Sequence, residues 1–411
     1  MRARLLAAAR RPAVQALFLV VALALILLLR RGDTLLVPGV WDEDGDMVIP
    51  DMLQNGLGTL LHPLNGYFVT IPKIIDLIAF GLSATQFPLI NAALAWLVAI
   101  GVGLAVAFAP TVLRHRGLAA LAVFLVPSDP EVFGTGLYTL WWAGILLLLV
   151  ALWRPDDRRI LARVLLLAVA GLSSPVILIA APVLVVRALV WRRRSEIVPA
   201  AVGLTIAIVQ GISLVVSTLT GTSNSPGSSG AGFAPTMLGE YLAHSWTSSS
   251  RIRIAAGILL VIFLVVGALL LRSGPRWPAI VLGYLLAASV ILSLARTAGL
   301  ALDPVTLGPR YFFYPFVLIS WFLLWLVARW RWRGLVALPV ALLLLGLANL
   351  PPGWSRPNAD LHWAQQVRAC AAADGPVRLS IQAAGSADHV WHVTLHGADC
   401  ASWLARDPFR G

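Results

Sequence analysis

Eleven runs of apolar residues, most of them close to the length of a membrane span, constrain this chain more than any other feature of its sequence. A spanning helix needs roughly 20 apolar residues. Only 12% of the residues are charged, whereas an ordinary soluble domain is about a quarter charged. We therefore expect an all-α polytopic membrane protein with about eleven transmembrane helices. The predicted spans are 13–30, 87–109, 117–128, 137–153, 160–173, 174–190, 198–217, 254–271, 278–295, 311–328 and 334–350.

Arginine distinguishes the two sides of the predicted membrane domain. The positive-inside rule assigns arginine-rich loops to the cytoplasm, and these loops alternate along the chain. Only Asp156, Asp157 and Glu196 of the 19 acidic residues lie on that side. The net charge of +12 therefore reflects topology, and we expect no nucleic-acid partner. The arginine clusters lie at 2–11, 114–116, 154–159, 192–194, 272–276 and 329–333.

This asymmetry predicts a multi-pass protein of the bacterial cytoplasmic membrane, with a cytoplasmic N-terminus and an extracytoplasmic C-terminus. Arg30 and Arg31 run against the trend. Within the first outer loop, 31–86, segment 70–85 has apolar residues at helical spacing but also Lys73 and Asp76. Inserting a charge at the centre of a span costs about 2.5–3.5 kcal/mol. We therefore expect this segment to be an amphipathic helix on the outer interface.

The chain divides into a transmembrane domain, 1–350, and a small extracytoplasmic tail, 351–411. In the tail, VRLSIQ and WHVTL alternate apolar and polar residues as strands do, which predicts a partly β appendage. An oxidising compartment favours a disulfide between Cys370 and Cys400, and two free thiols are the alternative. The loop 218–250 is rich in small residues and is predicted to be mobile.

The sequence WDEDGDMVIPDM carries four carboxylates within five residues, shortly after the first predicted helix. Such a group repels itself, which raises some of its pKa values, and it serves as a general base or a cation site. A divalent cation is therefore a candidate ligand, although the spacing does not fit an EF-hand. A solvated acidic loop is the alternative. The four acids are Asp42, Glu43, Asp44 and Asp46.

Two further groups are candidates for a substrate cavity. The first precedes segment 70–85, where an aromatic residue also serves as an interfacial anchor. The second lies in a proline-bounded turn, where carboxylates between two spans need water or a partner. The candidates are His62, Asn65 and Tyr67 in the first group and Asp129, Glu131 and Trp141 in the second.

Arg296, Arg310 and Tyr311 lie at the predicted outer ends of helices, where arginine again runs against the positive-inside trend. A guanidinium at this interface grips a phosphate through two parallel hydrogen bonds. An ion pair with the acidic loop is the alternative. Both interpretations predict that Arg310 lies close to the acidic segment 42–46.

The layout of residues 1–350 resembles that of the GT-C superfamily of integral membrane glycosyltransferases. An acidic motif in the first outer loop, WDEDGD, precedes a predicted interfacial helix and about ten further spans. The segments GYFVTIPK, PSDPEVF and GPRYFFYP are similar to those of a bacterial branch of that superfamily. Its members use polyprenyl-phosphate sugars on the extracytoplasmic side. This chain departs from them in its short length and small tail.

The resemblance implies a reaction and its partners. The donor would be a polyprenyl-phosphate-linked sugar, and the acceptor a glycan, lipid or protein of the cell envelope. One acid of segment 42–46, Asp44 before Asp42, would take the proton of the acceptor hydroxyl. Arg310, and less directly Arg296, would steady the departing phosphate. No organic cofactor is implied, and membrane lipids surround the spans.

Two other classes of protein fit parts of the pattern. A transporter of small molecules or lipid-linked sugars would carry ionisable residues near the middle of its spans, whereas these spans are nearly free of charge. A non-catalytic scaffold for envelope assembly would retain the fold without activity. Substitution of the acidic cluster separates an enzyme from a scaffold, because only an enzyme loses product while its fold persists.

Overall fold

The computed structural model describes residues 12–128, 130–155, 157–221, 233–243, 249–270, 276–296, 302–304, 308–329, 358–382 and 390–409. The predicted span 334–350 and the candidate residue Asp129 lie outside these ranges. Arg296 ends a described helix, but its side chain also lies outside the description.

Each predicted span within the described ranges is a helix. Six helical stretches there are long and apolar enough to cross a membrane, judged by length and composition. They are α2 (Pro12–Arg31), α6 (Phe87–Phe108), α11 (Arg194–Leu219), α13 (Ser250–Leu270), α14 (Trp277–Arg296) and the pair η3 (Pro309–Phe312) and α15 (Phe313–Arg329). The shorter helices are α7 (Arg116–Phe124), α8 (Thr139–Ala151), α9 (Ile160–Gly171) and α10 (Ile177–Trp191).

Apolar side chains cover the outside of several of these helices. On α2, Leu17, Phe18 and Leu25 are 64%, 69% and 53% exposed. A water-soluble protein rarely exposes so much contiguous apolar surface, so lipid is the expected neighbour. By contrast, α15 is enclosed and packs against α7, α13 and α14. The short turn η3 at its start is therefore held on a rigid central helix.

The first predicted outer loop folds into short helical pieces followed by one amphipathic helix. Helix α5 has 13 residues, which is short of the roughly 20 that a span needs. Lys73 is buried against other parts of the same loop, and Asp76 is buried between that loop and the start of α6. The pieces are α3 (Asp33–Leu36), η1 (Asp44–Val48), α4 (Ile49–Asn55), η2 (Gly56–Leu61) and α5 (Thr70–Leu82).

The two arginines that oppose the charge trend have structural roles. Arg30 donates hydrogen bonds to the carbonyl oxygens of Phe124 and Val126, at 2.7 and 3.0 Å, just past the end of α7. Orphan carbonyls at a helix C-terminus attract cations. Arg31 pairs with Asp33 at 3.2 Å. Both side chains are 2% exposed, so neither contributes to the charged surface.

The prediction of a mobile loop over 218–250 was wrong for part of its length, because α12 (Phe233–Ala243) lies within it. Helix α12 packs along α13, and glycines permit the close approach. A Cβ on Gly239 would lie 1.7 Å from the carbonyl oxygen of Arg253, and one on Gly257 would lie 2.0 Å from that of Pro235. The stretch 222–232, whose small residues carried the prediction, lies outside the described residues.

The tail forms the small partly β appendage that its alternating pattern predicts. Strands β1 (Pro376–Gln382) and β2 (Val390–His396) pair antiparallel, with Leu379 opposite Val393. They lie between α17 (Trp363–Ala371) and α18 (Gly397–Leu404). A disulfide joins Cys370 of α17 to Cys400 of α18.

The appendage shares one hydrophobic core with the first outer loop. Val40, Trp41 and Ile49 from the loop are buried together with Ile381 and Trp403 from the appendage. A segment this small rarely stabilises a core of its own. The loop supplies the surface that the appendage lacks.

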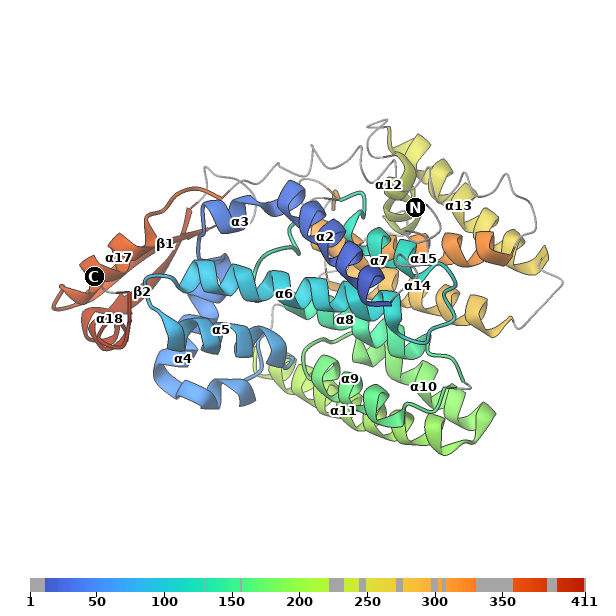
Figure 1. The fold of residues 1–411 in the computed structure, drawn as a ribbon, viewed down its shortest axis with the longest axis horizontal. Coiled ribbons are helices and arrows are strands. Elements are labelled where there is room, and N and C mark those ends of the chain that lie inside the picture. The colour runs from blue at the N-terminus through green and yellow to red at the C-terminus, as the bar shows by residue number, and fades with distance from the viewer. Residues whose placement is uncertain are drawn as a thin grey trace, which may run out of the picture.

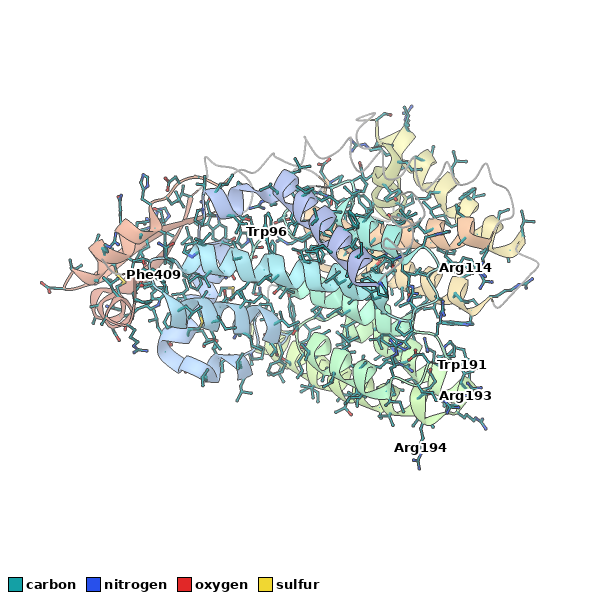
Figure 2. All side chains as sticks on the ribbon, viewed as in Figure 1. Trp96, Arg114, Trp191, Arg193, Arg194 and Phe409 are labelled. Carbon is teal, nitrogen blue, oxygen red and sulfur yellow. A yellow bond between two sulfur atoms is a disulfide. The ribbon has the colours of Figure 1, made fainter. Side chains whose placement is uncertain are left out.

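Arginine-rich loops and the appendage lie at opposite ends of the molecule. Figure 1 shows α17, α18 and the two strands beside α4 and α5 at one end of the long axis. Figure 2 shows Arg114, Arg193 and Arg194 at the other end, far from Phe409 of the appendage. This separation agrees with the polarity that the charge pattern predicts.

Candidate active site

The acidic segment Asp42–Asp46 forms a tight helical turn at the appendage end of the molecule. Its backbone is closed by a hydrogen bond from the Gly45 N–H to the Trp41 carbonyl oxygen, at 2.8 Å. The four carboxyl groups leave this turn towards different surroundings. Asp42 and Asp44 are buried, Glu43 is half-buried and Asp46 is exposed. Acids that look equivalent in the sequence therefore have different chemistry.

Asp44 contacts the interior of the outer region. Its Oδ1 accepts a hydrogen bond from the Leu137 N–H at 2.8 Å, and its carboxyl group bonds that of Asp76 on α5. Asp76 also accepts from the side-chain amide of Asn91 on α6. Burial, with the charge of Asp76, raises the pKa of Asp44 well above its usual range, and burial raises that of Asp76 to about 8. The pair therefore holds a proton at neutral pH.

Asp42 has a carboxyl group suited to proton exchange. Burial first, and then the charges of Glu43 and Asp46, raise its pKa to about 7, against the charge of Arg310. Its Oδ1 has no hydrogen-bond partner among the described residues. A carboxyl group whose pKa lies near the working pH both takes up and releases a proton readily. Asp42 is thus the acid of this segment with the properties of a general base.

Arg310 joins this segment through a chain of polar contacts. Its Nη1 forms an ion pair with Glu131 at 2.5 Å and donates to the Tyr138 hydroxyl at 2.9 Å. The Tyr138 hydroxyl lies 3.4 Å from Oε1 of Glu43 and 3.3 Å from Oε1 of Glu131. Burial comes first among the causes that raise the pKa of Glu43. One network thus connects η3, the turn before α8 and the acidic segment.

The guanidinium of Arg310 retains donors beyond this network. Both of its side-chain hydrogen bonds to described residues use Nη1, and the side chain is 25% exposed. Its Cζ lies 5.6 and 5.3 Å from the ring centroids of Tyr138 and Tyr311, so the two rings flank it. A flanked, partly exposed guanidinium with donors to spare is suited to gripping an anion.

A row of aromatic side chains leads away from Arg310. The Trp141 ring centroid lies 6.0 Å from that of Tyr311 and 5.0 Å from that of Tyr314. Tyr67 lies near Tyr314 and so extends the row towards the turn before α5. Asn65 has a backbone φ of +49° within that turn, so its role is to shape the backbone. Trp141 and Tyr311, predicted from separate segments, are therefore in contact, and Tyr67 interacts electrostatically with Tyr314 of the same row.

His62 belongs to a different cluster. Its Nδ1 lies 2.7 Å from Oδ1 of Asp51, and Lys73 donates to Asp51 and to the backbone oxygens of Thr59 and His62 at 3.0, 2.7 and 2.8 Å. These contacts include hydrogen bonds that lower the pKa of Asp51, against the effect of its burial. The cluster ties α4 and η2 to α5. No contact links it to the Arg310 network within the described ranges.

The structure brings Asp42, Glu43, Glu131 and Arg310 together, as the predicted proximity of Arg310 and the acidic segment requires. Tyr138 completes the network, but nothing in its sequence context marked it. Asp76 was marked only as a charge in an apolar segment. Among the described residues, no three His, Cys, Asp or Glu side chains converge as metal ligands. The arrangement is that of a helical membrane protein with a network of buried carboxyl groups, a tyrosine and an arginine.

Two crystal structures of ArnT from Cupriavidus metallidurans are similar to this chain. The match to the structure bound to undecaprenyl phosphate covers 82% of this chain and 63% of the ArnT chain, at 17% identity and a TM-score of 0.44. The apo structure covers 88% of this chain and 70% of that chain, at the same identity and TM-score. This chain thus spans less than two thirds of the ligand-bound ArnT chain. No protein-family model and no curated protein matches the sequence.

Proposed function

We propose that this protein is a membrane glycosyltransferase that moves a sugar from a polyprenyl-phosphate donor to an acceptor on the extracytoplasmic side. One observation carries the proposal. The buried carboxyl group of Asp42, whose pKa is raised to about 7, is within the electrostatic influence of a partly exposed guanidinium, Arg310, which Tyr138 links to Glu43 of the same acidic segment. A base next to an anion site is what glycosyl transfer from a lipid phosphate requires.

In this reaction the Asp42 carboxylate removes the proton of the acceptor hydroxyl as its oxygen attacks the anomeric carbon of the sugar. The bond from that carbon to the phosphate oxygen breaks, and the polyprenyl phosphate leaves with the bonding electrons. Arg310 stabilises the charge that develops on the phosphate through two parallel hydrogen bonds. Glu131 and Tyr138 hold the guanidinium in place.

Asp42 replaces Asp44 as the preferred base. The Asp44 carboxyl group is 1% exposed, accepts a hydrogen bond from the Leu137 N–H and is paired with Asp76. An acceptor hydroxyl therefore has little access to it. In the sequence analysis Asp44 ranked before Asp42, but a sequence does not reveal these partners.

The finer features of the proposal go beyond the fold. They comprise eleven spans, the bacterial cytoplasmic membrane, an extracytoplasmic C-terminus, and a glycan, lipid or protein as acceptor. The aromatic row of Tyr67, Trp141 and Tyr311 is the proposed contact for the sugar or the lipid tail, because aromatic faces pack against apolar and sugar C–H surfaces.

Donor binding and turnover test the proposal separately. Purified protein in liposomes is mixed with undecaprenyl phosphate, and the bound lipid is measured by native mass spectrometry. A panel of radiolabelled undecaprenyl-phosphate sugars is then tested for release of undecaprenyl phosphate in the presence of envelope extract. Repeating both assays with and without EDTA tests the divalent cation that the acidic motif predicted.

Asp42→Asn is expected to bind the lipid as the wild type does and to lose turnover by about 10²–10⁴-fold. Asp46→Asn is the matched control, because Asp46 is exposed on the same turn. Its charge raises the pKa of Asp42, so this variant should keep its turnover above pH 7, where Asp42 is deprotonated with or without that charge. Arg310→Lys keeps the charge but loses the two parallel bonds, so lipid binding should weaken. Full turnover in Asp42→Asn would remove the basis of the mechanism, and a wild-type protein that consumes no donor would favour a scaffold.

A further inference from the structure

The appendage contacts the acidic segment on both sides of Asp42. The Gln382 N–H donates to the Val40 carbonyl oxygen at 2.8 Å, and Gln382 pairs with Trp41 as a short parallel bridge. On the other side, a Cβ on Gly45 would lie 2.8 Å from Cδ1 and 3.0 Å from Cγ2 of Ile381. The end of β1 therefore lies against the backbone before Asp42 and the backbone after it.

The appendage is also anchored to the membrane domain at sites away from the acidic segment. Asp407 accepts hydrogen bonds from the Ser83 hydroxyl at 2.9 Å and the Thr85 N–H at 2.7 Å, at the start of α6. The indole N–H of Trp403 donates to the Phe80 carbonyl oxygen at 2.8 Å. These anchors fix β1 without using the acidic segment, so β1 acts as a rigid surface behind it.

We propose that Ile381 and Gln382 are positioning residues that hold Asp42 in place for proton transfer. This inference rests on the proposed function, since it assigns a role to the appendage in that reaction. Neither residue touches substrate. Their contacts fix the backbone on each side of Asp42. Glu131 and Arg310 supply two of the charges that act on its carboxyl group.

Burial is the main cause of the raised pKa of Asp42, so its position has a measurable signature. The charged groups that face Asp42 are Glu43 and Asp46 on its own turn, Glu131 before α8 and Arg310 on η3. None of them changes when Ile381 is truncated. A loosened segment admits water to Asp42, which returns its pKa towards the ordinary value for aspartate.

A double-mutant cycle between Ile381→Ala and Gly45→Ala tests the inference with the donor that the wild type consumes. Ile381→Ala is expected to lower kcat about 10- to 100-fold, because small misplacements of reacting groups have effects of this size. Its KM for the donor should stay unchanged, and the acidic limb of its pH–rate profile should move to lower pH. Gly45→Ala, whose Cβ would lie nearest Cδ1 of Ile381, at 2.8 Å, and 3.0 Å from Cγ1 of Val40, should regain turnover in the Ile381→Ala background.

Hydrogen–deuterium exchange gives a readout that needs no substrate. Peptides covering 40–48 should exchange faster in Ile381→Ala than in the wild type, with peptides of α18 unchanged. Arg378→Ala is the matched control, because Arg378 is exposed on the same strand. Ile381→Val, which removes only the Cδ1 atom nearest Gly45, replaces the alanine variant if the latter does not fold.

The outcomes separate this inference from the proposed function. Wild-type kcat, pH profile and exchange in Ile381→Ala, together with an inactive Asp42→Asn, would overturn the positioning role and leave the base in place. Additive effects of Gly45→Ala and Ile381→Ala would also overturn it. Full activity in Asp42→Asn would instead overturn the proposed base.

Discussion

At the scale of single residues, the carboxyl groups of Asp42 and Asp44 differ in the groups that surround them. Asp44 shares its surroundings with Asp76 and receives the Leu137 N–H, so its proton stays within the protein. Asp42 is buried within the electrostatic influence of Arg310, and its Oδ1 has no hydrogen-bond partner among the described residues. In the proposed reaction, this difference in partners, rather than a difference in residue type, makes Asp42 the base.

The pH dependence of turnover follows from Asp42. A general base must be deprotonated, and burial raises the pKa of Asp42 to about 7. We expect kcat/KM to rise with pH up to that value and to level off above it. Steady-state rates between pH 5 and 9 would check this. A profile already flat between pH 5 and 7 would show that another group takes the proton.

The Asp44–Asp76 pair makes stability fall as pH rises. Burial raises the pKa of Asp76 to about 8 in the folded protein, against about 3.9 in an unfolded chain. The folded state therefore binds the extra proton between these values, and its advantage is lost as pH rises towards 8. Asp76→Asn, which still accepts the Asn91 amide bond, should show a flatter decline of Tm from pH 5 to 9.

Differential scanning fluorimetry in detergent measures this decline. Asp360→Asn is the control, because the Asp360 side chain is 67% exposed. The same steep decline in Asp76→Asn as in the wild type would show that the pair does not share a proton.

Sequence reasoning found the acidic segment and Arg310 but not the assignment among the acids. Charge and position in the chain are visible in a sequence, so Arg310 near the acidic segment was predictable. Tyr138 and Asp76 reach the site only through the packing of α5, α6 and α8, which one sequence does not encode in any local pattern. Residue roles that depend on long-range partners were therefore missed.

At the scale of elements, the appendage depends on its disulfide. The bond closes a loop of 30 residues between α17 and α18. In the chain-entropy model such a loop is worth about 3–4 kcal/mol. Cys370→Ser with Cys400→Ser should therefore speed hydrogen exchange throughout 358–409. Mass spectrometry of the wild type purified without reductant should find no free thiol, and finding two would contradict the pairing.

The strands of the appendage were predictable because alternation marks them, but its docking was not. Ile381 lies against Gly45 because position 45 has no side chain. The sequence shows the glycine, but it does not show which residue fills the space beside it. The same limit explains the missed helix α12. Gly239 and Gly257 admit neighbouring backbone there, whereas composition alone indicates flexibility.

At the scale of the whole molecule, the two ends carry different groups. Arg193 and its neighbours lie at one end, and the appendage lies at the other (Figure 2). Asp360→Cys, at an exposed site of the appendage, should react with a membrane-impermeant thiol reagent in intact cells. Arg193→Cys should react only after the cells are opened. The reverse pattern would invert the proposed orientation.

The core shared by the first outer loop and the appendage also bears on how the protein is made. Synthesis delivers Trp41 long before Ile381, and at about 5–20 residues per second the interval is on the order of tens of seconds. Throughout that interval the loop exposes apolar surface whose partner has not yet been translated. A ribosome that stops early thus releases a chain with most of its helices but with Asp42 unsupported. Completion of translation is itself the step that assembles the site.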